Sequence, residues 1–306
     1  MTLLKFLKLI RFGNLIFVAV CLLLIRYAFF ESTSAAVSLS DFGYALLIIA
    51  NLSLAAAGYI INDIYDVTTD RINKPKKLYI GNGISEKTAF NWFIGFNVIG
   101  VGIGFYLANV IGLPAFSALF IFSSALLYIY SSYLKNVPLA GNIAVSFLVA
   151  GVAALPGIFD LLPAINAVNR EQQAMYFSIL LDYSFFGFFI NLLREMVKDQ
   201  EDQQGDYNSG GNTLPLILGT ARTNKVIFAI GLIPLVAIVY YVYSYLFENT
   251  AAVLYVLFQI LAPLLFFLVQ ISTATEKKDF TRLSLILKII LFLCLVSIGL
   301  HQILLN

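Results

Sequence analysis

Two groups of three aspartates share one spacing, and they are the residues in this sequence best suited to chemistry. The first aspartate motif is Asp63, Asp66 and Asp70, and the second aspartate motif is Asp199, Asp202 and Asp206. In each motif the later aspartates follow the first by three and seven positions. On an α-helix these positions fall within about 60° of one another, so each motif would place its carboxylates along one helix face.

A row of carboxylates at the end of a helix needs a positive partner. The C-terminal end of a helix already carries partial negative charge, so cations are expected to offset the added aspartates. Mg²⁺ binds through one or two carboxylates, while phosphate oxygens and water complete its coordination. Basic residues also lie beside both motifs, among them Arg71, Lys74 and Lys198. The pattern therefore predicts that the six aspartates bind Mg²⁺ together with a diphosphate.

The elements that carry the two motifs are expected to be membrane-spanning helices. Of the 306 residues, 60% are hydrophobic and 12% charged, and the mean hydropathy is +0.88. This is too apolar for a soluble protein, and each crossing of a bilayer takes about 20 apolar residues. We expect an all-α, polytopic bundle of about nine transmembrane helices that forms one membrane domain over residues 1–306. The approximate spans are 13–31, 42–62, 88–108, 113–133, 138–158, 173–197, 224–246, 250–272 and 282–304.

The charge distribution predicts which side of the membrane the motifs face. Cytoplasmic loops collect Lys and Arg, and most of the 19 basic residues lie in segments on the same side as the N-terminus. The first motif ends the second span and the second motif ends the sixth, so both are expected on this side. We expect an integral protein of the cell inner membrane with a cytoplasmic N-terminus and active site. A diphosphate bound beside a lipid-lined cavity would carry a hydrocarbon tail, as prenyl diphosphates do.

The residues around both motifs also follow a known family pattern. Residues 62–70 read NDIYDVTTD and are followed by RINKP, and residues 199–206 read DQEDQQGD. They resemble the UbiA superfamily of intramembrane prenyltransferases, whose motifs are N-D-x-x-D-x-x-x-D and D-x-x-D-x-x-x-D. LIRFGN resembles that family's Arg-Pro-x-Asn element, with Phe12 in place of the proline. YLKNVPLAGN resembles the segment whose lysine helps to hold the diphosphate, here Lys135.

The resemblance implies a Mg²⁺-dependent transfer of a prenyl group from a prenyl diphosphate to a lipophilic acceptor. Within the superfamily, REMVKDQEDQQGD followed by NTLP most resembles the digeranylgeranylglyceryl phosphate synthases, which prenylate a glycerol-phosphate ether lipid. The six aspartates would be the catalytic and metal-binding residues. The expected substrate-binding residues are Asn62, Arg71, Lys74, Lys135, Lys198, Arg11 and Asn14. No nucleic-acid partner is expected.

Two other functions fit parts of the sequence. An aromatic-acceptor prenyltransferase of quinone biosynthesis, acting on a dihydroxynaphthoate or hydroxybenzoate, would use the same motifs. The segment KKLYIGNGIS departs from the RPIPSG found in many members, which leaves the donor and acceptor preference open. A membrane transporter would place ionisable residues at mid-membrane depth. Asp182 is the main candidate there, and both a structural hydrogen bond and a substrate contact are open for it.

Overall fold

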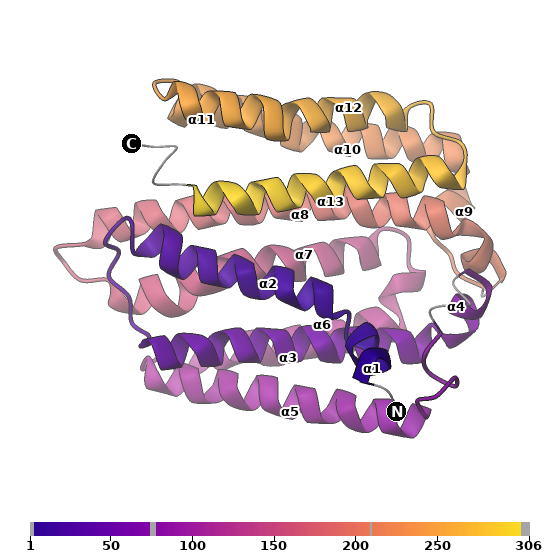
Figure 1. The fold of residues 1–306 in the computed structure, drawn as a ribbon, viewed down its shortest axis with the longest axis horizontal. Helices are drawn as coiled ribbons and strands as arrows, with labels where there is room; N and C mark the ends of the chain where they lie inside the picture. The colour runs from indigo at the N-terminus through magenta and orange to yellow at the C-terminus, as the bar shows by residue number, and fades with distance from the viewer. Residues whose placement is uncertain (1–2, 74–77, 209, 301–306) are drawn as a thin grey trace. The chain divides into compact units, whose positions relative to one another are not determined.

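The computed structural model describes residues 3–73, 78–208 and 210–300, and these residues are mostly helical (Figure 1). Nine helical stretches within the described ranges are long and apolar enough to cross a membrane. The prediction of an all-α bundle with about nine spans is therefore confirmed. The helices have these bounds: α1 Leu3–Leu9, α2 Phe12–Leu23, α3 Asp41–Tyr65, α4 Val67–Asn73, α5 Glu86–Val110, α6 Ser117–Ser132, α7 Ala140–Pro156, α8 Arg170–Asn208, α9 Leu214–Leu218, α10 Thr220–Tyr241, α11 Thr250–Tyr255, α12 Ala262–Ile271 and α13 Lys277–Gly299.

Several spans join α-helix to π-helical turns without leaving the helical path. A π-helix makes i→i+5 hydrogen bonds, which are rare and usually occur over a single turn. The π-helical turns extend α2, α7 and α10, and one links α11 to α12, so that these pieces form single crossings. Their bounds are Leu24–Phe30, Gly157–Leu161, Val242–Leu246 and Val256–Leu261.

Polar side chains set where the long helices begin. Ser40 and Ser85 precede α3 and α5, and the hydroxyl of each accepts a hydrogen bond from a backbone N–H in the first turn. Glu276 and Asp279 form a capping box at the start of α13. Such caps satisfy N–H groups that have no partner within the helix. The α13 helix consequently begins at Lys277, five residues before the predicted span at 282.

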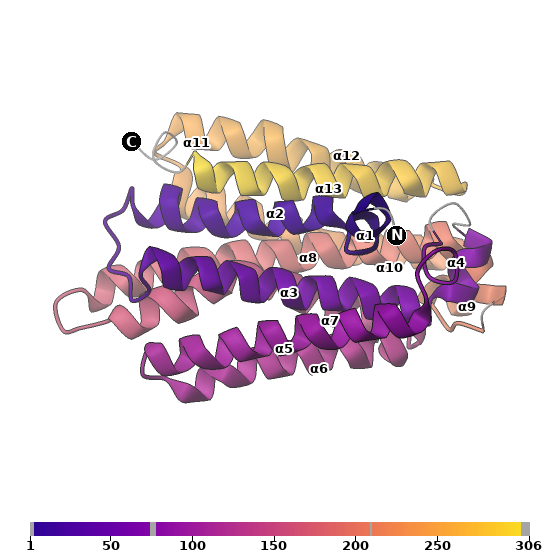
Figure 2. The same ribbon diagram turned by 60° about the horizontal axis from the view of Figure 1, so that its bottom comes forward.

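The described residues divide into two compact units. Unit 1 contains residues from 1–23, 34–135 and 152–180, and its central helix α3 packs against α5 and α6. The helices α3 and α5 run side by side in both views (Figures 1 and 2). Glycines allow α3 to approach both neighbours closely, since a Cβ on Gly58 of α3 would lie 2.6 Å from Leu127 of α6, and one on Gly100 of α5 would lie 2.8 Å from Leu54 of α3. Small residues at such contacts are typical of membrane helices.

Unit 2 contains residues from 24–33, 136–151 and 181–306, so that α8 begins in unit 1 and continues in unit 2. Within unit 2, α12 packs against α10 and α13. One hydrophobic cluster includes buried side chains of α8, α10, α12 and α13, with Phe267 at 0% exposure. Two tyrosine hydroxyls are satisfied inside this unit: Tyr183 lies 2.8 Å from the Ser297 hydroxyl, and Tyr255 donates to the Leu293 carbonyl at 2.7 Å. The expectation of a single domain over 1–306 stays a prediction.

Candidate active site

The first aspartate motif spans a brief interruption between two helices of unit 1. Asp63 lies on α3, Asp66 is the residue at which α3 ends, and Asp70 lies on α4. The Asp66 N–H donates to the Asn62 carbonyl at 2.9 Å, and the Asp70 N–H donates to the Asp66 carbonyl at 2.7 Å. These bonds keep the chain on a nearly helical path. The backbone therefore stays close to the path that the predicted spacing assumes, and the placement of the three carboxylates on one side stays a prediction.

Arg11 is the cationic partner of Asp63. Its Nη2 lies 3.1 Å from Asp63 Oδ1, and its guanidinium lies over the Tyr59 ring at 4.8 Å from the centroid. Burial acts to lower the pKa of Arg11, but the Asp63 carboxylate and the nearby Tyr59 and Tyr130 together offset this, and the pKa is raised. Asn14 donates to the Tyr59 hydroxyl at 3.3 Å. Both residues that resemble the N-terminal family element thus lie against the end of α3.

The backbone at Arg11 is itself unusual. Arg11 lies in the turn between α1 and α2 and has a φ of 49°. A positive φ is uncommon for a residue with a Cβ, and such strain occurs where the surrounding structure holds it in place. Here the strained residue is the one that contacts Asp63.

Asp66 is held through both of its carboxylate oxygens. Lys135 Nζ lies 2.6 Å from Asp66 Oδ1, and Asn62 Nδ2 donates to Asp66 Oδ2 at 2.6 Å. Lys135 also lies 5.8 Å from the centre of the Tyr65 ring, which can add a cation–π attraction. The structure therefore brings together Asn62 and Lys135, two of the predicted substrate-binding residues, on the central carboxylate of the first motif.

The second aspartate motif lies on a single unbroken helix in unit 2. The helix α8 continues to Asn208 and carries Asp199, Asp202 and Asp206 in its last three turns. Asp199 Oδ2 accepts a hydrogen bond from Asn142 Nδ2 at 2.9 Å. Unlike the first motif, the leading carboxylate here contacts a neutral amide.

The basic residues just before the second motif are engaged with Glu195. Lys198 Nζ lies 2.9 Å and 3.1 Å from the two Glu195 oxygens, and Arg194 Nη1 lies 3.1 Å from Oε1 of the same residue. Lys198 was expected to contact a diphosphate, and the structure shows it in this local ion pair. Arg71 is exposed on α4, and Lys74 lies outside the described residues.

Comparison with known proteins shows the family of the chain. The UbiA prenyltransferase family matches residues 14–296. The chain belongs to the UbiA prenyltransferase family. It is an integral, multi-pass membrane protein of this family, as its nine apolar spans within the described residues require.

Two relatives named digeranylgeranylglyceryl phosphate synthase illustrate the similarity. The one from Methanococcoides burtonii is 29% identical over 296 residues, which cover 95% of this chain and 97% of the relative. The one from Methanopyrus kandleri is 34% identical over 202 residues, which cover 65% of this chain and 68% of the relative.

Solved structures of the family share the fold. A structure of digeranylgeranylglyceryl phosphate synthase has a TM-score of 0.69 at 21% identity and covers 98% of each chain. A UbiA homologue from Archaeoglobus fulgidus, bound to GPP and Mg²⁺, has a TM-score of 0.57 at 16% identity, covering 96% of this chain and 99% of the homologue.

The donor atoms of both motifs suit the divalent cation found in that UbiA homologue. No group of three or more His, Cys, Asp or Glu side chains in the described part of the chain is already arranged to hold a metal ion. Mg²⁺ does not need such a group, because one or two carboxylates suffice when phosphate oxygens and water supply the other ligands. Each motif offers closely spaced carboxylates, and Asn62 and Asn142 each hold one carboxylate oxygen, on Asp66 and Asp199 respectively. The residues present therefore fit a metal-bound diphosphate.

Three of these contacts could not be found from the motifs. Tyr59, Asn142 and Glu195 each contact a predicted site residue, although the sequence analysis did not select them. The sequence did carry a signal for Asn142, because burying an amide within an apolar span costs free energy unless the amide is hydrogen-bonded. Asp182, which was left open, is exposed on α8.

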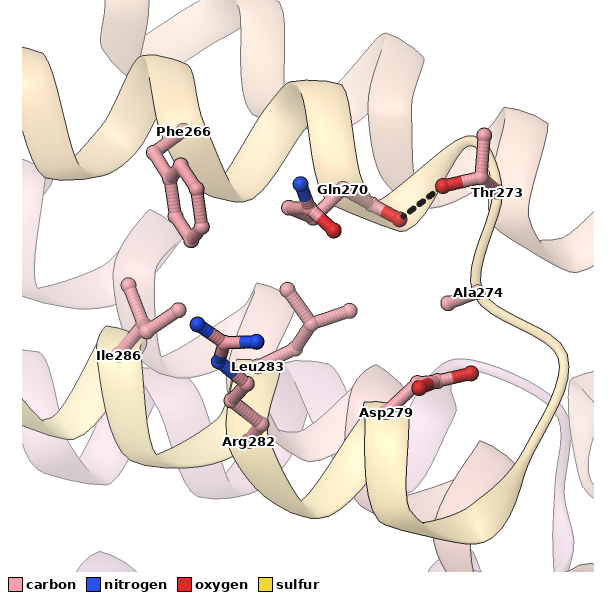
Figure 3. A pocket seen from close by; sticks show the side chains of 8 residues that line it. All are labelled: Phe266, Gln270, Thr273, Ala274, Asp279, Arg282, Leu283 and Ile286. Carbon is pink, nitrogen blue, oxygen red and sulfur yellow. Dashed lines mark hydrogen bonds between the residues drawn. The ribbon is translucent and has the colours of Figure 1, made fainter.

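Unit 2 also contains a small cavity that is lined by other residues. It has a volume of about 100 Å³ and lies between α12 and α13, where Phe266 and Gln270 face Arg282 and Ile286 (Figure 3). The Arg282 guanidinium lies 5.9 Å from the centre of the Phe266 ring. None of the predicted site residues lines this cavity, so the two motifs remain the candidate active site.

Proposed function

We propose that this chain transfers a geranylgeranyl group from geranylgeranyl diphosphate to an ether lipid of the geranylgeranylglyceryl phosphate type. The observation that carries the proposal is the pair of aspartate motifs in a UbiA chain whose full-length relative is named for a digeranylgeranylglyceryl product. The cytoplasmic side of the cell inner membrane is the proposed location of the motifs, because the basic residues gather on that side.

The first motif and the two cations beside it, Arg11 and Lys135, would bind the polar end of the donor. In the proposed complex, Arg11 and Lys135 would bind oxygens of the diphosphate, and their contacts with Asp63 and Asp66 support this role. The six aspartates would hold Mg²⁺, with Asn62 fixing Asp66, and Arg71 and Lys74 would add positive charge. When bound, Mg²⁺ would neutralise charge that develops on the departing diphosphate.

The reaction forms one bond to carbon and breaks another. The allylic C–O bond of the donor breaks, diphosphate leaves with the bonding pair, and the acceptor's hydroxyl oxygen forms a new C–O bond to the prenyl carbon. The hydroxyl proton is released to water. Apolar helices would exclude water from the prenyl carbon, which limits hydrolysis of the donor.

An acceptor screen tests this function. Purified protein would be incubated with Mg²⁺, labelled geranylgeranyl diphosphate and one acceptor at a time, and the products analysed by mass spectrometry. We expect product with geranylgeranylglyceryl phosphate and little with dihydroxynaphthoate or hydroxybenzoate. Product only with an aromatic acceptor would overturn the assigned acceptor. A lack of product with every acceptor, and no diphosphate release, would overturn prenyl transfer itself.

A further inference from the structure

A buried chain of hydrogen bonds leads from the interior of unit 2 to the second aspartate motif. Asn191 donates to the Ser146 hydroxyl at 3.2 Å, and that hydroxyl donates to the Asn142 backbone carbonyl at 2.6 Å. The Asn142 side chain then donates to Asp199 Oδ2 at 2.9 Å. These side chains come from α7 and α8, and Asn142, Ser146 and Asn191 are all less than 10% exposed. Buried polar groups that satisfy one another in this way hold a fixed geometry.

The partner of Asp199 is a neutral amide, and this indicates the role of the hydrogen bond between them. A cation would both hold and neutralise the carboxylate, as Arg11 does for Asp63. An amide donates one hydrogen bond and carries no charge, so it fixes the orientation and leaves the negative charge available. Only Oδ2 of Asp199 is engaged by a hydrogen bond within the described residues, and Oδ1 is not.

The start of α7 is also built to place Asn142. Leu139 immediately precedes α7 and has a φ of 61°, which is an uncommon conformation for a leucine. It lies three residues before Asn142, so the direction of the first turn of α7 depends on it. Backbone strain of this kind is found where a functional residue must be held in position.

We propose that Asn142 is a positioning residue that holds Oδ2 of Asp199 and thereby presents Oδ1 to a divalent cation. This inference rests on the proposed function, since it assigns a role to a residue of the same site. Side chains that orient metal ligands by hydrogen bonding are a general feature of metal sites, and their loss typically costs about 10- to 100-fold in metal affinity or activity.

Metal binding in the absence of transfer tests the proposal. Mn²⁺ would be titrated into purified protein with inorganic diphosphate present, and bound Mn²⁺ measured by its paramagnetic resonance signal. We expect Asn142→Ala to raise the Mn²⁺ concentration at half-saturation about tenfold. Asn142→Gln keeps an amide and should recover much of this loss. In the transfer assay, the Asn142→Ala protein should need more Mg²⁺ but regain most of its maximal rate at saturation.

Asn191→Ala is the matched control. It also removes a buried amide from the same hydrogen-bonded chain, but it leaves the contact between Asn142 and Asp199 in place. We expect a lower melting temperature with unchanged Mn²⁺ binding. Equal metal binding by Asn142→Ala and the wild-type chain, or an equal loss in both alanine variants, would overturn the positioning role.

The outcomes also separate this inference from the proposed function. If the wild-type chain binds Mn²⁺ and diphosphate and Asn142→Ala binds them equally well, the positioning role alone is wrong. If the wild-type chain binds neither, both proposals are wrong. Should Asn142→Ala fail to fold, Asn142→Gln is compared with Asn191→Ala. The displaced amide of Asn142→Gln should leave a residual loss of Mn²⁺ affinity that Asn191→Ala lacks, and equal Mn²⁺ binding by these two variants would overturn the positioning role.

Discussion

In the first aspartate motif the leading carboxylates pair with cations, whereas in the second motif the leading carboxylate contacts an amide. Arg11 and Lys135 reach Asp63 and Asp66 from other parts of unit 1. In unit 2, Asn142 reaches Asp199, while Lys198 is paired with Glu195 on the same helix. The two motifs thus share one spacing of aspartates, but the leading carboxylate contacts a cation in the first motif and a neutral amide in the second.

This difference indicates a division of roles between the motifs. Two aspartates of the first motif are paired with Arg11 and Lys135, and this mixture of charges suits a group that binds both the metal and the departing diphosphate. The second motif keeps its carboxylate oriented but not neutralised, which suits a metal ligand. The following predictions test this division, from the largest expected effect to the smallest.

Removing the charge of a leading aspartate should have the largest effect. We expect Asp63→Asn and Asp199→Asn each to lower the transfer rate more than about 100-fold, because each loses a metal ligand while keeping the side chain's size. Transfer would be measured in purified protein at saturating Mg²⁺. Asp41→Asn, at the opposite end of α3, is the control and should retain nearly full activity. Full activity in both leading variants would contradict the assignment of both motifs.

Loss of a cation from the first motif should be the next largest effect. We expect Lys135→Ala to lower the transfer rate about 10- to 100-fold, since the diphosphate loses a positioned positive charge. Lys225→Ala, which removes an exposed cation from α10, serves as the control. The measurement is the rate at saturating donor. A Lys135 variant as active as this control would mean that the cations of the first motif act only on its aspartates.

Loss of Lys198 should have the smallest effect if the two motifs differ as described. Lys198 is 32% exposed and its ion pair with Glu195 is local, so we expect Lys198→Ala to change the rate by about fivefold or less. Glu195→Gln, which releases Lys198, gives the complementary measurement and should change the rate by a similar amount. A loss with Lys198→Ala as large as that with Lys135→Ala would show that both motifs supply cations to the diphosphate.

The sequence predicts the spans well and their ends less well. Hydropathy places all nine crossings, but it ends the sixth near residue 197, whereas α8 continues to Asn208. The extra turns, residues 198–208, are polar and include three Gln, one Glu and one Lys, which are good helix formers that hydropathy does not detect. At α13 the capping box decides the start, and this signal also lies outside an apolar window.

The sequence selects the carboxylates of the candidate site and three of the residues that contact them, Arg11, Asn62 and Lys135, but not the partner of Asp199. The spacing of Asp63, Asp66 and Asp70 is a local property of the sequence, so this motif could be identified without the structure. The contact between Asn142 and Asp199 joins residues 57 positions apart and depends on how α7 packs against α8. Neither residue spacing nor composition carries that information. The local pairing of Lys198 with Glu195 is an i,i+3 contact that helical periodicity allows.

The close contact at Gly58 links the packing of unit 1 to the accuracy of its chemistry. Gly58 lies five residues before Asp63, which is about 7.5 Å along the axis of α3. A Cβ there would lie 2.6 Å from the end of the Leu127 side chain, so a larger residue would require a displacement of that side chain or of α3. Because reacting groups must be held to within about 0.5 Å, a displacement of α3 would be felt at Asp63. A substitution at Gly58, which contacts neither metal nor substrate, would then lower activity as the loss of a catalytic residue does. Screens for inactive variants should therefore find substitutions at Gly58 as well as at the aspartates.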